Sequence, residues 1–149
     1  MKVLIISYNP LTLSNNGGKH LCALFSEFKP DEMMQYYIYP TLPDSWRCSS
    51  YFRQTDSQLL SRQKQKKISH IVEPFDNEGM ALHRPPNIYS KTEKCRYVKL
   101  LFRDILWKVS KWDTEELDDW IENGKPDCIF SDTGDSCFLY HIPLSLSCT

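Results

Sequence analysis

The chain opens with a short apolar run, which a polar turn and an amphipathic pattern follow. The apolar run is Val3 to Ile6, and the polar turn ends in Asn16-Gly17-Gly18. Four apolar side chains then recur at the spacing of one helix face: Leu21, Leu24, Phe25 and Phe28. Because this period is that of an amphipathic helix, the segment predicts a strand, a glycine turn and a helix in that order.

A similar succession occurs near the other end of the chain. Pro126 to Ser131 reads as a strand, and a polar turn of Asp132-Thr133-Gly134-Asp135 follows it. The apolar positions after this turn mark a helix: Phe138, Leu139, Ile142 and Leu146. A third strand is predicted over 34–39, because this segment is rich in aromatic and β-branched residues and stops at Pro40.

The middle of the chain predicts three helices and two irregular stretches. Asp56 is expected to cap a helix over 57–67. A helix over 94–111 carries apolar residues at helical spacing, and we expect it to belong to the core. Asp113 is expected to cap the third, which ends where Gly124 supplies a left-handed residue. Residues 40–55 read as irregular, and 68–92 as a long loop or insertion, because prolines and glycine interrupt any period.

Strands that alternate with helices favour an α/β fold with a parallel, Rossmann-like sheet and flanking helices. We expect one such domain over residues 1–149, with the strands at 2–8 and 126–131 near its centre, since continuous apolar runs are buried on both faces. The sequence stops within an apolar helix, and three strands make a thin sheet. We therefore expect an N-terminal piece of a longer polypeptide, whose Phe138/Ile142/Leu146 face lacks part of its packing.

Composition and charge narrow the class of protein. With 41% hydrophobic and 25% charged residues, the chain is typical of a soluble globular protein. Its net charge of −1 argues against nonspecific electrostatic binding to nucleic acid. No signal peptide is apparent, and no apolar run approaches the ~20 residues of a membrane span. The six cysteines form no C-x-x-C pair and no zinc-spaced cluster. We expect reduced thiols, a cytoplasmic protein and no metal site.

The first glycine turn is a candidate ligand site. A turn after a parallel strand can aim backbone N–H groups at a phosphate or a sugar hydroxyl, and Gly17-Gly18 would allow close approach. On this interpretation Gly18→Val impairs ligand binding more than folding. The alternative, that the two glycines only permit a tight turn, stays open. The sequence lacks G-x-G-x-x-G, the P-loop motif and G-x-S-x-G, which disfavours dehydrogenases, P-loop nucleotidases and α/β-hydrolases.

Three segments, in this order, resemble the N-terminal domain of GT-B fold glycosyltransferases of the large retaining superfamily called group 1. They are residues 2–7, the Asn16-Gly17-Gly18 turn with its helix, and the Lys-Pro-Asp strand at 125–131. Residues 51–56 are also similar to bacterial polysaccharide-biosynthesis members of this group. The resemblance spans nearly the whole chain. Its individual motifs are short, so their order is the stronger argument.

The resemblance implies the acceptor-side half of an enzyme that moves a sugar from a nucleotide-sugar donor to a saccharide or lipid-linked acceptor, without a further cofactor. Asn16, Gly17 and Gly18 would lie at the donor diphosphate, which the two glycines would touch through backbone N–H groups. Asp132, Thr133 and Asp135 would face the cleft and bond acceptor hydroxyls. For the two aspartates, capping the next helix is an equal alternative.

The resemblance also implies what the chain lacks. The second half of such enzymes holds most of the nucleotide sugar, so the catalytic residues remain unknown and the chain alone is expected to be inactive. The full-length enzyme could associate peripherally with a membrane. Two other classes stay open: a nucleotide-sugar enzyme of different chemistry, such as an epimerase, which the absent G-x-G-x-x-G disfavours, and a non-catalytic binding or interaction domain with a flavodoxin-like sheet.

Overall fold

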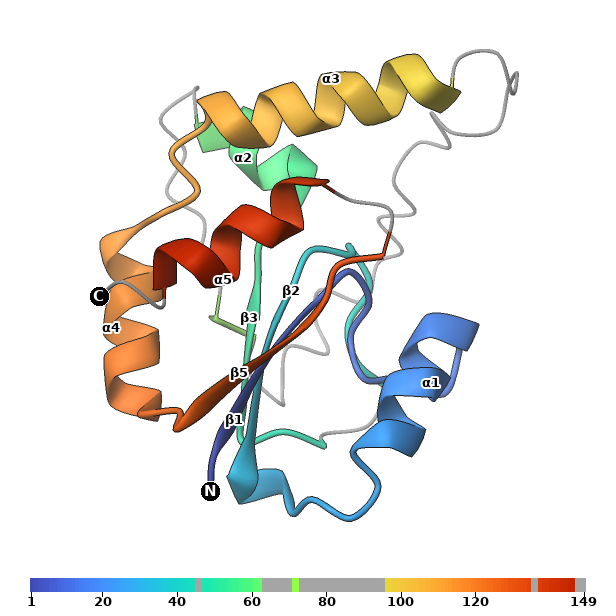
Figure 1. Cartoon of the computed structure of the whole chain (residues 1–149), viewed down its shortest axis with the longest axis vertical. Helices are drawn as coiled ribbons and strands as arrows, with labels where there is room; N and C mark the ends of the chain where they lie inside the picture. Colours follow the sequence, from blue (N-terminus) through green and yellow to red (C-terminus); the bar gives the residue numbers. More distant parts are fainter. Residues whose placement is uncertain (45–46, 63–70, 73–95, 135–136, 147–149) are drawn as a thin grey trace.

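A computed structural model describes residues 1–44, 47–62, 71–72, 96–134 and 137–146. Within these residues the sheet has five strands in the order β4-β3-β2-β1-β5 (Figure 1). The strands are β1 (Val3–Ser7), β2 (Met33–Tyr37), β3 (Ser50–Arg53), β4 (Ile71–Val72) and β5 (Cys128–Asp132). All neighbouring pairs are parallel except β3 and β4, which are antiparallel. The fold is therefore a mixed, mostly parallel α/β sheet, and the predicted parallel pairing is confirmed.

Helices flank the sheet on both faces. They are α1 (Asn16–Leu24), α2 (Asp56–Arg62), α3 (Arg96–Val109), α4 (Glu115–Gly124) and α5 (His141–Leu146), with short 3-10 turns η1 (Pro30–Glu32) and η4 (Cys137–Tyr140). Figure 1 shows α1 on one side of the sheet and α4 and α5 on the other, while α3 lies across the top, beyond the ends of the strands. None of the described helices is long and apolar enough to cross a membrane.

The two faces of the sheet form separate apolar clusters, which explains the unbroken apolar run of β1. Leu4 and Ile6 pack with side chains of α3, α4 and α5, whereas Val3 and Ile5 pack with the buried side of α1. Successive side chains of a strand point to opposite faces, so a strand covered on both sides must be apolar at every position. The sequence analysis predicted a buried parallel strand for the same reason.

The strand predictions need two corrections. The region 40–55, predicted to be irregular, contains β3. The predicted loop or insertion at 68–92 contains β4, whose two residues are the only described ones in this region. β3 has only four residues, and its first and last residues are polar. The two buried residues between them, Tyr51 and Phe52, are too few to show the pattern of a strand in the sequence. β5 is at the edge of the sheet rather than near its centre, and its Cys128 is exposed.

The helix ends also differ from the sequence predictions. The glycines were predicted to lie in a turn before the first helix, but Asn15 caps α1, so both glycines lie in its first turn. α2 is capped by Thr55 instead of Asp56, because Thr55 and Gln58 bond each other's backbone N–H groups as a capping box. The cap of α4 is Thr114 rather than Asp113.

At the other end of α4 the left-handed residue is Lys125 rather than Gly124. Gly124 serves packing: a Cβ there would lie 2.6 Å from the Sδ of Met34. A glycine near a helix end therefore marks a close approach here, and the neighbouring lysine adopts the positive φ.

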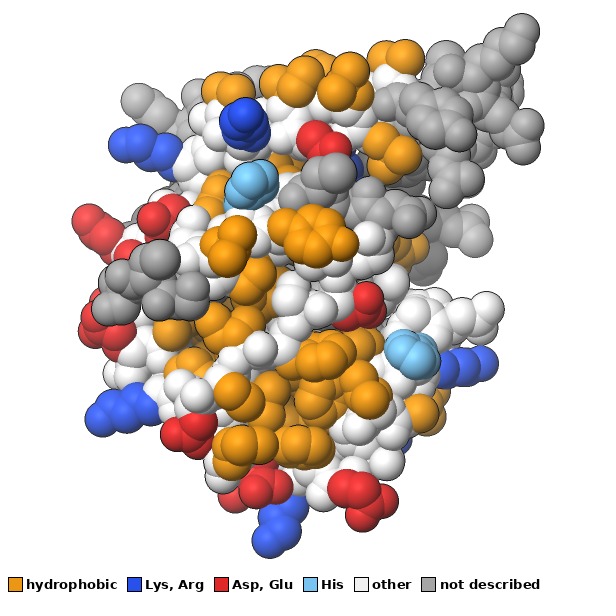
Figure 2. Space-filling model, in the orientation of Figure 1, with side chains coloured by type: hydrophobic (Ala, Val, Ile, Leu, Met, Phe, Trp, Pro, Cys, Tyr) orange, Lys and Arg blue, Asp and Glu red, His pale blue; other side chains and the backbone are white. Residues whose placement is uncertain are grey.

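The apolar face of α3 is exposed, which contradicts its predicted place in the core. Val98, Leu101, Phe102, Ile105 and Val109 are 50 to 75% exposed, whereas Trp107 is 1% exposed. Figure 2 shows these orange side chains along the outer side of α3. The helix lies across the strand ends and touches the protein through a narrow strip, so its period alone did not reveal which side is buried.

The last helical segment is better packed than expected. Phe138 and Ile142 are buried in the same cluster as Trp107, which contradicts the predicted exposed face; the side chain of Leu146 lies outside the described residues. On α1, Leu24 is half exposed although the sequence pattern placed it on the buried face. The helix ends at Leu24, and Phe25 and Phe28 continue the contact beyond it.

Candidate crevice at the carboxyl edge of the sheet

The two segments predicted to be polar turns both start from one edge of the sheet. β1 and β5 are neighbours, and their last residues, Ser7 and Asp132, are paired. From there the chain goes to α1 on one face and to η4 and α5 on the other. In α/β proteins, ligands bind beyond the carboxyl ends of adjacent parallel strands whose connections leave to opposite faces. This place, which we call the crevice between β1 and β5, is the candidate site.

A buried glutamine holds the loop that follows β1. Gln35 is fully buried in β2, and its Nε2 donates to the Oγ of Ser7 at 2.7 Å and to the carbonyl of Asn9 at 3.0 Å. Its Oε1 accepts from the N–H of Leu11 at 2.9 Å. The Ser7 hydroxyl also donates to the Asn9 carbonyl at 2.7 Å. These bonds fix the path of the backbone that leads into α1.

The amino end of α1 presents fewer free amides than the sequence suggests. The Oδ1 of Asn15 accepts from the N–H of Gly18 at 2.7 Å, so this amide is used within the protein. The N–H groups of Asn16 and Gly17 lie in the first helical turn, where no carbonyl of the helix itself can accept them. Asn16 is exposed and Gly17 is half buried, whereas Gly18 is buried. Asn16 and Gly17 thus carry first-turn amides that no carbonyl of the helix uses.

Gly18 is required by packing. A Cβ at this position would lie 2.6 Å from the carbonyl oxygen of Thr12 and 2.8 Å from that of Pro10, and both are backbone atoms. At Gly17 the nearest atom would be the side-chain Nδ2 of Asn9, at 2.6 Å, which can move. Neither glycine has a positive φ. Gly18 is therefore needed for the close packing of α1 against the preceding loop, and not for the conformational freedom of a tight turn.

The β5 side of the crevice carries polar groups that are partly open to solvent. Asp132 and Thr133 are both half buried, and Gly134 has a φ of 49°, the left-handed region that favours glycine. Asp135 lies outside the described residues. Asp132 is the last residue of β5 and η4 begins only at Cys137, so Asp132 is not the cap of that turn. Its side chain is partly open to solvent at this edge of the sheet.

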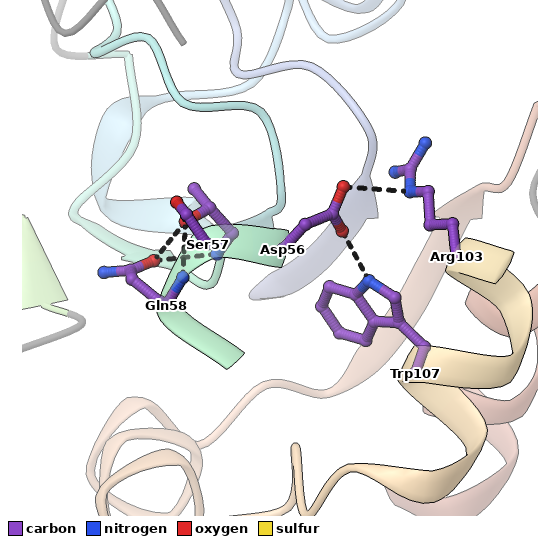
Figure 3. A network of polar contacts seen from close by, with 6 residues as sticks. Asp56, Ser57, Gln58, Arg103 and Trp107 are labelled. Carbon is purple, nitrogen blue, oxygen red and sulfur yellow. Dashed lines mark hydrogen bonds and ion pairs between the residues drawn. The ribbon is translucent and has the colours of Figure 1, made fainter. Parts of the chain in front are cut away.

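A second polar group at this edge was missed by sequence reasoning. Asp56, the first residue of α2, follows β3 and accepts a bond from the Nε1 of Trp107 at 2.6 Å (Figure 3). The Nε of Arg103 lies 3.4 Å from the other carboxylate oxygen of Asp56. The guanidinium of Arg103 also lies over the rings of Tyr8, at 4.7 Å, and Phe138, at 5.0 Å. Arg103 thus contacts segments that follow three different strands.

The sequence does contain signals for this network. Arg103 and Trp107 are four residues apart, so they share one face of a helix. The Thr55-x-x-Gln58 pattern is that of a capping box and places Asp56 at the first helical position. No sequence pattern shows that the two helices meet, because 33 residues separate them (63 to 95).

The polar groups described at this edge are backbone amides, the guanidinium of Arg103 and the carboxylates of Asp56 and Asp132. Among the described residues no group of His, Cys, Asp and Glu could hold a metal ion. Burial raises the pKa of the Cys48 thiol to about 12 and also raises the pKa of Cys22, so both thiols keep their protons near neutral pH. Cys22, Cys48 and Cys128 are free thiols. Backbone amides, guanidinium and carboxylate groups recognise phosphoryl and hydroxyl groups.

Comparison with models of known protein families, with curated proteins and with solved structures finds no match for this chain.

Proposed function

We propose that this chain is the N-terminal, acceptor-side domain of a GT-B type glycosyltransferase, which transfers a sugar from a nucleotide-sugar donor to a saccharide or lipid-linked acceptor. The observation that carries the proposal is the pairing of Ser7 with Asp132, because the segment that leads to the first glycine turn and the Asp132-Thr133 turn both start from this edge of the sheet. The order of the sequence motifs, described above, supports the same assignment.

The two sides of the crevice suit two different groups. The first-turn amides of Asn16 and Gly17 lie at the positive end of the α1 dipole, which favours a diphosphate. The carboxylate of Asp132 and the hydroxyl of Thr133 can accept from and donate to sugar hydroxyls. Gln35 keeps the first side in place before any ligand arrives, and such preorganisation lowers the entropic cost of binding.

The test is a titration of the isotope-labelled chain, followed by the backbone amide signals in NMR spectra. Nucleotide sugars are expected to shift the signals of Asn16 and Gly17, and saccharides those of Asp132 and Thr133. Residues at the opposite edge of the sheet, such as Val3 and Met33, serve as internal controls. Shifts only at that opposite edge, or none with any compound of a broad panel, would contradict the proposal.

A pair of matched variants sharpens the test. Asp132→Asn is expected to weaken saccharide binding at least tenfold, because a charge-assisted bond is lost at a half-buried position. Asp119→Asn removes an exposed carboxylate from α4 and is expected to leave binding unchanged. No glycosyl transfer is expected from the chain alone, since a half-cleft neither encloses both substrates nor excludes water. Turnover well above a control without protein would refute the assignment to an acceptor-side half.

A further inference from the structure

We propose that Arg103 binds a phosphoryl group through the outer edge of its guanidinium, in the crevice between β1 and β5. The inference rests on the proposed function in assuming that this crevice receives a ligand. It adds a binding residue on α3, a helix that the sequence analysis assigned to the core alone.

The first argument is how the guanidinium is held. Its Nε side faces Asp56, at 3.4 Å, and its plane lies over the rings of Tyr8 and Phe138. Figure 3 shows one terminal nitrogen of Arg103 pointing away from Asp56, while the other lies on the Asp56 side of the guanidinium. The two terminal nitrogens form the edge that arginine uses for paired bonds to phosphate or carboxylate oxygens. The 3.4 Å contact with Asp56 is made by Nε, so it does not use the outermost nitrogen.

The second argument is that Asp56 neutralises Arg103 only in part. Asp56 also accepts the short 2.6 Å bond from Trp107, so its carboxylate is shared between two donors. At 3.4 Å, the Nε of Arg103 makes an ion pair with Asp56 but has no hydrogen-bond partner. An anion at the outer edge would add negative charge to a guanidinium that Asp56 neutralises only in part.

The third argument is location. Tyr8 directly follows β1, and Phe138 lies in η4, which follows β5. A guanidinium over both rings therefore lies where the chain leaves the carboxyl ends of β1 and β5 in different directions. The side chain of Arg103 is 11% exposed. Charge-assisted bonds at such a poorly hydrated position are stronger than at the surface.

A phosphoryl group fits better than a plain saccharide, because a guanidinium offers donors and a full positive charge. Two sources of this chemistry exist for a transferase: the diphosphate of the donor and the phosphate of a lipid-linked acceptor. Both present tetrahedral, anionic oxygens to the same edge of Arg103. The experiment distinguishes them by the compound that binds.

The experiment measures binding of three probes to the chain by calorimetry: inorganic pyrophosphate, a nucleoside diphosphate and a short-chain prenyl phosphate. Arg103→Gln is expected to weaken binding of at least one probe tenfold or more, and Arg103→Lys to weaken it less. Lys108→Gln removes an exposed cation from the same helix and is the matched control for loss of charge, with less than a twofold effect expected.

Asp56→Asn separates ligand binding from a purely structural role. It removes the partner charge while an amide oxygen can still accept from Trp107. If Arg103 binds the phosphoryl group, Asp56→Asn keeps or increases affinity; if Arg103 only holds α3 in place, Asp56→Asn and Arg103→Gln weaken binding alike. The latter result, or no binding of any probe by the parent chain, would overturn the inference. Phosphoryl binding that needs Arg103, without binding of any nucleotide sugar or saccharide, would overturn only the proposed function.

Discussion

Gly18→Ala is expected to destabilise the fold, whereas Gly17→Ala, one residue earlier, is expected to be nearly neutral. A Cβ at Gly18 would lie 2.6 and 2.8 Å from two backbone carbonyl oxygens and 2.3 Å from the Cγ2 of Thr12. The carbonyls belong to the loop that Gln35 fastens to the sheet through Asn9 and Leu11. Neither the loop nor the helix can move without breaking these bonds.

The expected magnitude follows from two opposing terms. Overpacking against fixed atoms costs about 3 kcal/mol, the upper part of the usual range, because the clash is with backbone. Replacing glycine by alanine in a helix returns up to about 1 kcal/mol. The net loss is about 2 kcal/mol, which lowers the Tm by roughly 6 °C for a domain of this size. At Gly17 the Nδ2 of Asn9 can move aside, so the change in stability stays within about 0.5 kcal/mol.

Thermal and urea unfolding of the two variants, followed by circular dichroism, provides the measurement. The sequence analysis expected a β-branched residue at Gly18 to harm ligand binding more than folding; the close backbone contacts reverse this order for Gly18. A Gly18→Ala protein as stable as the Gly17→Ala protein would show that the loop yields easily. The packing argument, and with it the rigid path into α1, would then be wrong.

Two further outcomes test the burial pattern. Phe102→Ser, on the outer side of α3, is expected to change the free energy of unfolding by less than about 0.5 kcal/mol, whereas Trp107→Ala, on its inner side, is expected to lower it by about 3–5 kcal/mol. Urea unfolding measures both values, and equal losses would contradict the exposed face of α3. The free energy of unfolding is expected to fall as pH rises from 9 to about 12, because burial raises the pKa of Cys48 from 9.0 and the unfolded chain loses this proton first. The slope from this thiol approaches about 1.4 kcal/mol per pH unit, and a Cys48→Ala protein with the same slope would refute its source.

The sequence by itself determined the elements with strong local patterns. The continuous apolar runs of β1 and β5, the aromatic run of β2 and the helical period of α3 and α4 all predicted the right kind of element. It also determined that the first strand ends in a polar turn before a helix, and hence that a ligand crevice could exist there. These features follow from side-chain periodicity and turn chemistry, which act over a few residues.

Tertiary structure decided which side of each element is buried and what meets at the crevice. The period of α3 shows an apolar face, but only its position across the strand ends leaves Leu101 and Phe102 in solvent. β3 is too short to show a period, and it exists because β2 supplies its hydrogen bonds. Asp56 and Trp107 are 51 residues apart, and their bond depends on two helices packing together. Contacts of this kind are set by the whole core, so no local pattern could have predicted the network around Arg103.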